Sequence, residues 1–323
     1  MRVCCSRIPF FILYLINNKE AMSENKKVNV GGQAVIEGVM MRSPEAVSIA
    51  VRRPDGKIAL KRHEYKGFTK RHKFFNLPFI RGGVILIESM VWGIKALNFS
   101  SDVAMREEGK PEEKGMSSLM LALTMVFALA AGMGLFFFIP LLIAEATGVE
   151  NGIAFNVIDG VVRLLIFLGY LGLISLWKEI RRIFEYHGAE HKSIFAFESG
   201  SPLTIAGAKP FKTFHPRCGT SFLLIVVIVS VIVFAFTGRP HTMADRLIRF
   251  LLIPLIGGIS YEIIKLSDSK YGKKIAGFLT SPGLWLQRIT TKEPDDSQLE
   301  TAIVALKSSL NLKQDDNLDI VYE

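Results

Sequence analysis

Two histidines and a glutamate lie close together near the middle of the chain, in the segment 185–192 (EYHGAEHK). His187 and His191 are four residues apart, so on a helix both rings project from one face, one turn apart. Two imidazoles at this spacing can bind one divalent metal ion, and we expect zinc. Glu190 lies between them, in the His-x-x-Glu-His order that inverts a zinc-peptidase pattern. The segment predicts two metal ligands, with Glu190 as the catalytic base of a hydrolase.

The face that carries the histidines is otherwise apolar, so the rings should be buried. A buried imidazole needs either a hydrogen-bond partner or a metal. The rings could therefore equally be ordinary buried histidines that pair with carbonyl or carboxylate groups. Gly188 also disfavours a regular helix by about 1 kcal/mol relative to alanine. The residues leave both interpretations open.

Three more side chains are candidate metal ligands. His215 and Cys218 are three residues apart, in a Pro- and Gly-containing turn before an apolar run. Both suit a soft metal, although His215 could instead orient Arg217 and Cys218 could be a small core residue. Glu262 lies in an otherwise uncharged apolar run, which favours a functional role, with a pair to Lys265 as the alternative.

Long apolar runs must position these residues. Four runs are predicted to span a membrane, and the first two are long enough to do so with tilt. Asp159 and Arg163 in the second run are four apart and could form an ion pair. The expected spans are 118–144, 153–177, 222–236 and 250–264.

The basic residues orient these spans and explain the net charge of +9. Lys and Arg concentrate in the 178–217 connection and after the fourth span, whereas 145–151 has none and 237–249 has Arg239, Arg246 and Arg249. By the positive-inside rule both termini are cytoplasmic, in a cell (plasma) membrane. The charge then requires no nucleic acid, and no nucleic-acid-binding motif accompanies it. The expected partners are the lipid bilayer and a cytoplasmic protein.

The polar parts of the chain predict smaller elements. Residues 47–51 and 57–61 alternate around a turn at 53–56, which predicts a β-hairpin, and 31–41 adds a strand with glycines where the backbone bends or approaches something closely. An apolar helix at 84–97 is short and charged enough to be interfacial. A capped amphipathic helix should begin at Asp295 and end at Leu310, followed by a loose end at 313–323.

The fold class is therefore a mainly α-helical polytopic membrane protein with about four transmembrane helices, a small N-terminal α+β cytoplasmic domain and amphipathic interfacial helices. Translation is expected to begin at Met22. Cys4, Cys5 and Cys218 make no disulfide framework. The expected parts are a 1–27 extension outside the fold, a 28–100 hairpin domain with its interfacial helix, a 101–117 charged linker, a 118–266 four-helix bundle with a cytoplasmic 178–220 connection, and a 267–323 cytoplasmic amphipathic tail.

Four motifs in order give the chain a family resemblance. They are 31–42 (GGQAVIEGVMMR), 185–192 (EYHGAEHK), 215–222 (HPRCGTSF) and 284–291 (LWLQRITT). Together they resemble the YqhQ family of bacterial multi-pass membrane proteins over about residues 28–310. The resemblance implies a domain of unknown function that is predicted to be a metal-dependent enzyme.

Three functions remain open from the sequence. The first is a metal-dependent hydrolase at the cytoplasmic membrane face, with His187, His191 and a third ligand, and a peptide or lipid-linked substrate. The second is a non-catalytic membrane scaffold or assembly factor. The third, less favoured because no internal repeat is evident, is a transporter that uses Asp159, Arg163 and Glu262.

Overall fold

The computed structural model describes residues 28–67, 73–106, 117–216, 218–267 and 273–323, and these are mostly helical. The expected start at Met22, Cys4, Cys5 and most of the expected linker lie outside them. The strands are β1 (Gly31–Val35), β2 (Gly38–Arg42), β3 (Ala46–Arg52), β4 (Ile58–Glu64) and β5 (Ile320–Tyr322). The helices are the 3-10 helix η1 (Lys73–Asn76), α3 (Ile80–Ala104), α4 (Ser118–Met133), the π-helical segment η2 (Gly134–Phe138), α5 (Ile139–Ala146), α6 (Gly152–Ile174), α7 (Lys178–Glu198), α8 (Ile205–Ala208), α9 (Gly219–Thr237), α10 (Met243–Leu251), α11 (Ile253–Ser267), α12 (Lys273–Thr290) and α13 (Asp296–Ser309).

In the described chain, β1 to β5 form one sheet in sequence order. The predicted hairpin is confirmed as β3 and β4, an antiparallel pair with Arg52 opposite Ile58. The single strand predicted at 31–41 is instead two antiparallel strands, β1 and β2, because the chain reverses at Glu37 with a left-handed φ of 52°. Gly38 permits a close approach there, since an added Cβ would lie 2.9 Å from Val51 Cα.

The end of the chain joins this sheet. β5 pairs with β4 in parallel, with Ile320 opposite Ile58. Residues 320–322 are therefore not the loose end that was predicted. The outer edge of β4 has backbone groups that need hydrogen-bond partners, and the last residues of the chain supply them.

Helices α7 and α13 cover one face of the sheet. The capped helix predicted at Asp295 is confirmed, with a capping box between Asp295 and Gln298. Its stripe of Leu299, Ile303 and Leu306 is buried in one core with Tyr186 of α7 and Val39 of β2. We call β1–β5, α7, α8 and α13 the sheet layer.

The sheet layer corrects the expected division of the chain. Its core joins the N-terminal strands, the 178–198 segment and the C-terminal helix, which were assigned to three separate parts. Helix α13 is accordingly a core helix and not an interfacial tail. The physical reason is that the strands have an apolar face that must be buried, and the apolar stripes of α7 and α13 bury it.

Helix α3 packs on the other face of the sheet. Ala96 and Val103 share a core with Ile49 and Val51 of β3. The helix is longer than the predicted 84–97 and continues into the expected linker as far as Ala104. Near its start, Gly82 lies so close to α11 that an added Cβ would be 3.0 Å from Gly258 Cα. Its place at a membrane interface stays a prediction.

Within the described residues, four helices are long and apolar enough to cross a membrane, as predicted. We call these four the bundle. The second ends at Ile174, three residues earlier than expected, whereas the fourth combines α10 and α11 and is longer than expected. The spans are Ala122–Ala146, Gly152–Ile174, Gly219–Thr237 and Met243–Leu266.

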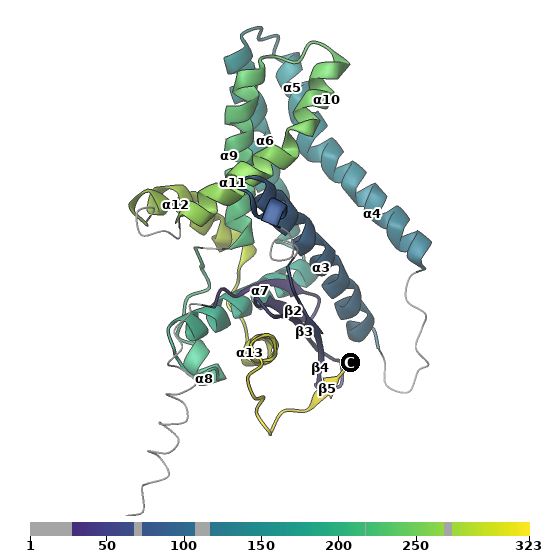
Figure 1. Cartoon of the computed structure of the whole chain (residues 1–323). Coiled ribbons are helices and arrows are strands. Elements are labelled where there is room, and N and C mark those ends of the chain that lie inside the picture. The colour runs from purple at the N-terminus through teal and green to yellow at the C-terminus, as the bar shows by residue number, and fades with distance from the viewer. Residues whose placement is uncertain (1–27, 68–72, 107–116, 217, 268–272) are drawn as a thin grey trace, which may run out of the picture.

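The sheet layer and the loops 145–151 and 237–242 lie at opposite ends of the molecule (Figure 1). The two loops contact each other, because Arg239 donates to the Val149 carbonyl at 3.2 Å, and Asn156 in the first turns of α6 donates to the Gly238 carbonyl at 3.0 Å. The C-terminus lies beside the sheet, at the end that also holds α7. The connections with few positive charges and those with many are therefore separated by the length of the bundle.

Candidate metal centre

The two candidate histidines project from α7 at the boundary between the sheet layer and the bundle. Their ring centroids are 4.5 Å apart, as expected for neighbours one turn apart. From Tyr186 onward α7 is mostly buried, and His191 is only 2% exposed. The predicted burial of this helix face is thus confirmed for His191, and His187 is partly buried.

Each ring is held through its Nδ1 atom by a backbone carbonyl. His187 Nδ1 lies 2.8 Å from the Thr290 carbonyl oxygen, and His191 Nδ1 contacts that of Thr213. A carbonyl oxygen can only accept, so both Nδ1 atoms carry a hydrogen, and in a neutral ring held in this way the lone pair is on Nε2. This orientation through the second ring nitrogen is the one that metal-binding histidines use.

Both rings interact with the side chain of Cys218. Its Sγ lies 3.1 Å from His187 Nε2 and also interacts with the His191 side chain. Ligand atoms of these three residues all lie within 4.8 Å of one another. We call His187, His191 and Cys218 the histidine–cysteine cluster. Among the described residues, it is the one group of three or more His, Cys, Asp or Glu side chains that are close enough together to share a metal ion.

The chemistry of this donor set fits a zinc ion. Two imidazoles and one thiolate are ligands that zinc prefers, and three protein ligands leave a fourth position for a reactant. Burial lowers the pKa of His191 below its ordinary value, so its ring favours the neutral form that binds metal. The cluster could hold the ion through two nitrogens and one sulfur.

Two of the five predicted ligands lie outside this cluster. Glu262 forms an ion pair with Arg81 at the start of α3, with one bond of 2.7 Å. It does not pair with Lys265 as the alternative had it. His215 is nearby, with its ring 5.6 Å from that of His191, but its Nε2 lies 3.5 Å from a Glu198 carboxylate oxygen.

Glu190 is buried between α7 and β1, one residue before His191. Its carboxylate accepts a hydrogen bond from the backbone N–H of Gly32. Burial raises the pKa of Glu190 to about 7, opposed by the nearby His187 and by the Gly32 hydrogen bond. A carboxyl group with this pKa can accept and release a proton near neutrality.

Glycines allow the close packing around this helix. A Cβ added to Gly32 would lie 2.9 Å from the Glu190 carboxylate, and one added to Gly188 would overlap the Lys292 carbonyl oxygen. The Lys292 N–H in turn donates to the Phe184 carbonyl at 2.9 Å. Helix α7 is continuous through Gly188, and the absence of a side chain there lets the chain that follows α12 pack directly against it.

All four motifs of the family resemblance meet around α7, at the histidine–cysteine cluster and at Glu190 beside it. The first contributes Gly32, the second both histidines, the third Cys218 and the fourth Thr290. In the fourth motif, Gln287 is fully buried, accepts from the His215 N–H at 2.7 Å and donates to the His215 carbonyl at 2.8 Å. It thereby fixes the turn that leads to Cys218.

Sequence reasoning missed the groups that orient the cluster. Thr213, Thr290 and Gly32 act through backbone atoms, so their side-chain types give no signal. Gln287 did give a signal in the sequence, because an amide that follows a tryptophan and a leucine in an apolar helix needs polar partners.

A second set of polar residues is buried in the bundle. The predicted pair of Arg163 and Asp159 is confirmed at 2.8 Å. Arg249 is 2% exposed and donates to the Asn156 amide oxygen at 2.7 Å. These groups link α6, α10 and the α9–α10 connection.

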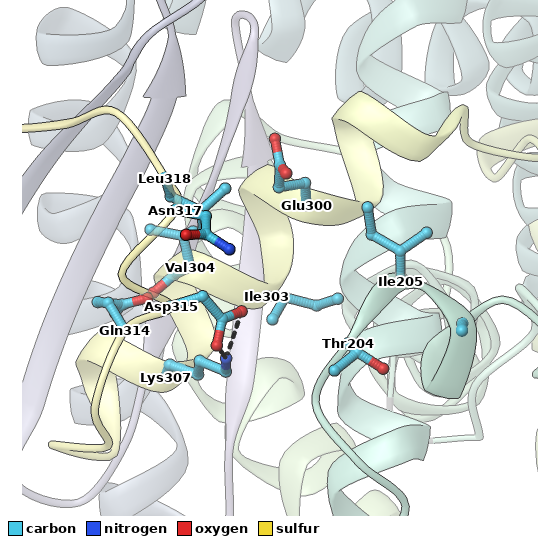
Figure 2. Close-up of a pocket in the computed structure, with 11 residues that line it drawn as sticks. Thr204, Ile205, Glu300, Ile303, Val304, Lys307, Gln314, Asp315, Asn317 and Leu318 are labelled. Atoms are coloured by element: carbon cyan, nitrogen blue, oxygen red, sulfur yellow. Dashed lines mark hydrogen bonds and ion pairs between the residues drawn. The ribbon is translucent and has the colours of Figure 1, made fainter.

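A cavity of about 380 Å³ lies in the sheet layer, between α8, α13 and the segment before β5 (Figure 2). Its charged groups include Lys307 and Asp315, which form an ion pair at 2.8 Å across the wall. Because Asp315 neutralises Lys307, this lysine gives the cavity no net positive charge with which to bind an anion.

Comparisons with known proteins place the chain in a family. Residues 77–312 match a family described as "Protein of unknown function (DUF1385)". The chain is also 35% identical over 297 residues to "Uncharacterized protein YqhQ" of Bacillus subtilis (strain 168), covering 88% of this chain and 92% of the relative. No solved structure matches. The resemblance to YqhQ is confirmed, and the chain belongs to the DUF1385 family.

Proposed function

We propose that the protein is a metal-dependent membrane hydrolase whose centre is the histidine–cysteine cluster. The observation that carries the proposal is the orientation of the two rings. Both Nδ1 atoms lie against carbonyl oxygens to which they donate, His187 Nε2 lies 3.1 Å from Cys218 Sγ, and the His191 side chain also interacts with Cys218. His187 and His191, Cys218 and Thr290 come from three of the four motifs, and Thr213 precedes one of them, so distant parts of the chain supply this arrangement.

The residues have distinct roles in this proposal. His187, His191 and Cys218 hold zinc, which supplies Lewis-acid activation when it is bound. Glu190 moves a proton from the attacking water to the leaving group. The Gly32 N–H holds the Glu190 carboxylate in place, and Gln287 positions the turn before Cys218.

We place the centre at the cytoplasmic face of a cell membrane. The sheet layer and the Lys- and Arg-rich 178–217 connection lie at one end of the bundle, and the opposite loops contain few positive charges. The positive-inside rule then puts the sheet layer, and the C-terminus beside it, in the cytoplasm. A substrate reaches the centre from that side or from the inner leaflet.

Elemental analysis of purified protein tests the proposal. We expect about one zinc per chain in detergent-purified wild type from zinc-supplemented cells, prepared without chelators. His187→Ala and His191→Ala should each weaken zinc binding by more than about 100-fold, because even groups that only support a ligand contribute 10- to 100-fold. His241→Ala, an exposed histidine remote from the cluster, is the matched control and should retain zinc.

Wild-type protein that contains no stoichiometric metal would overturn the enzyme proposal. The histidines would then be structural, as a scaffold or assembly factor requires. In that case the alanine variants should lower protein abundance as their main effect.

A further inference from the structure

An apolar cavity of about 350 Å³ opens on the side of the bundle, between α6, α9 and α12. Its wall consists of aliphatic and aromatic side chains from the three helices together with a proline. They are Leu164, Leu168, Leu224, Ile228, Pro282, Trp285 and Leu286. Two of the three helices are candidate membrane spans, so the cavity faces the region where a bilayer's hydrocarbon would lie.

The cavity begins next to the histidine–cysteine cluster. Leu224 follows Cys218 by six residues on α9, which is about 9 Å along a helix, and Ile228 lies about 15 Å along it. On α12, Leu286 precedes Thr290 by one turn. The cavity therefore extends away from the cluster toward the middle of the bundle.

Side chains typical of a membrane–water boundary occur in the cavity wall and just before α7, the helix that carries the histidines. Trp285 in the cavity wall is 54% exposed, and Trp177, the residue before α7, is 68% exposed. Arg288 is exposed three residues after Trp285, on the same face of α12. Tryptophan and basic residues are enriched at this depth because they contact both headgroups and hydrocarbon.

We propose that the cavity binds the hydrocarbon chain of a lipid-linked substrate and so places the substrate's polar group at the histidine–cysteine cluster. Its role as a substrate subsite rests on the proposed function. A lipid chain fits better than a peptide, because a peptide brings backbone polar groups that this apolar wall cannot satisfy. The exposed Arg288 suits an anionic headgroup beside the cluster.

Photo-crosslinking tests the proposal with a defined probe. The full chain is reconstituted into phosphatidylglycerol vesicles that contain a phosphatidylglycerol with a diazirine at the end of one acyl chain. Labelled peptides are then mapped by mass spectrometry. We expect labelling of 224–228 and 282–286 to exceed that of α4, whose Leu123 and Phe127 are exposed and serve as a reference for bulk lipid.

Two substitutions on one helix separate cavity binding from general lipid contact. Ile228→Trp fills the cavity and should lower its labelling about ten-fold, since an indole leaves no room for a chain. Ile232→Trp is the matched control, one turn further along α9, outside the cavity wall and 55% exposed. It should leave the labelling unchanged. Size-exclusion profiles establish that both variants are folded.

The outcomes distinguish this proposal from that of the metal centre. Labelling no higher than that of α4, or lowered equally by both substitutions, overturns the lipid subsite even if zinc is present. Enriched labelling in wild type that contains no zinc supports chain binding and overturns the hydrolase. His187→Ala should lose zinc and keep the enriched labelling, because the residue is not part of the cavity wall.

Discussion

The buried polar side chains of the bundle and those of the histidine–cysteine cluster differ in how they are paired. In the bundle, Asp159 and Arg163 are opposite charges in direct contact. In the histidine–cysteine cluster, each ring donates through Nδ1 to a carbonyl and both rings interact with the Cys218 side chain. The bundle pair thus joins opposite charges, whereas the cluster brings together three groups that can each be a metal ligand. Burial is common to both, so what separates them is the kind of groups that are brought together.

The largest effect should follow from breaking the bundle pair. Asp159→Ala leaves the Arg163 guanidinium buried without its counter-charge, which should destabilise the protein by about 3–5 kcal/mol. Unfolding in detergent measures the loss. Zinc per folded molecule should stay unchanged, because the pair is remote from the cluster.

A double substitution sharpens that result. Asp159→Leu with Arg163→Leu removes both charges and should recover most of the lost stability, since apolar pairs of similar volume often replace buried ion pairs. A double variant as unstable as Asp159→Ala would contradict this pairing and show that Asp159 mainly stabilises another group, such as the buried Arg249.

The next largest effect should come from Gln287, which supports the histidine–cysteine cluster. Gln287→Leu leaves the N–H and carbonyl of His215 without their partner and loosens the turn before Cys218. We expect zinc affinity to fall about 10- to 100-fold, as measured by competition with a chromophoric chelator. Gln314→Leu, which removes a comparable hydrogen bond to the Val304 carbonyl in the sheet layer, should bind zinc like wild type.

A smaller effect on the free energy of unfolding is expected where β1 packs against Glu190. Gly32→Ala places a methyl group 2.9 Å from the Glu190 carboxylate, and overpacking of this kind costs about 1–3 kcal/mol. Chemical denaturation measures the change. Gly31→Ala is the neighbouring control, because its added Cβ has no atom within 4 Å. Equal effects of the two substitutions would contradict the close contact.

The smallest effect should come from an ion pair at the surface of the sheet layer. Arg182 on α7 pairs with Glu37 in the β1–β2 turn, and the arginine side chain is 47% exposed. Because water screens such pairs, Arg182→Ala should lower the free energy of unfolding by less than about 1 kcal/mol. A loss as large as that of Asp159→Ala would remove the contrast between the two regions.

The sequence predicted the features that depend on local patterns. The four spans follow from long apolar runs with few charges, the β3–β4 hairpin from alternation around Asp55 and Gly56, and the α13 boundary from its Asp295 cap. The neighbouring positions of His187 and His191 follow from helix geometry. Each of these depends on residues close together in the chain, whose spacing is visible without a fold.

The tertiary structure alone decided which residues complete the cluster. Cys218 and Glu262 were equal candidates, and Glu262 pairs with Arg81, 181 residues away, where no local pattern indicated a partner. The core helix α13 and the strand β5 likewise pack on strands more than 200 residues earlier. Contacts of this kind depend on how apolar faces are buried together, and the order of residues does not state that by itself.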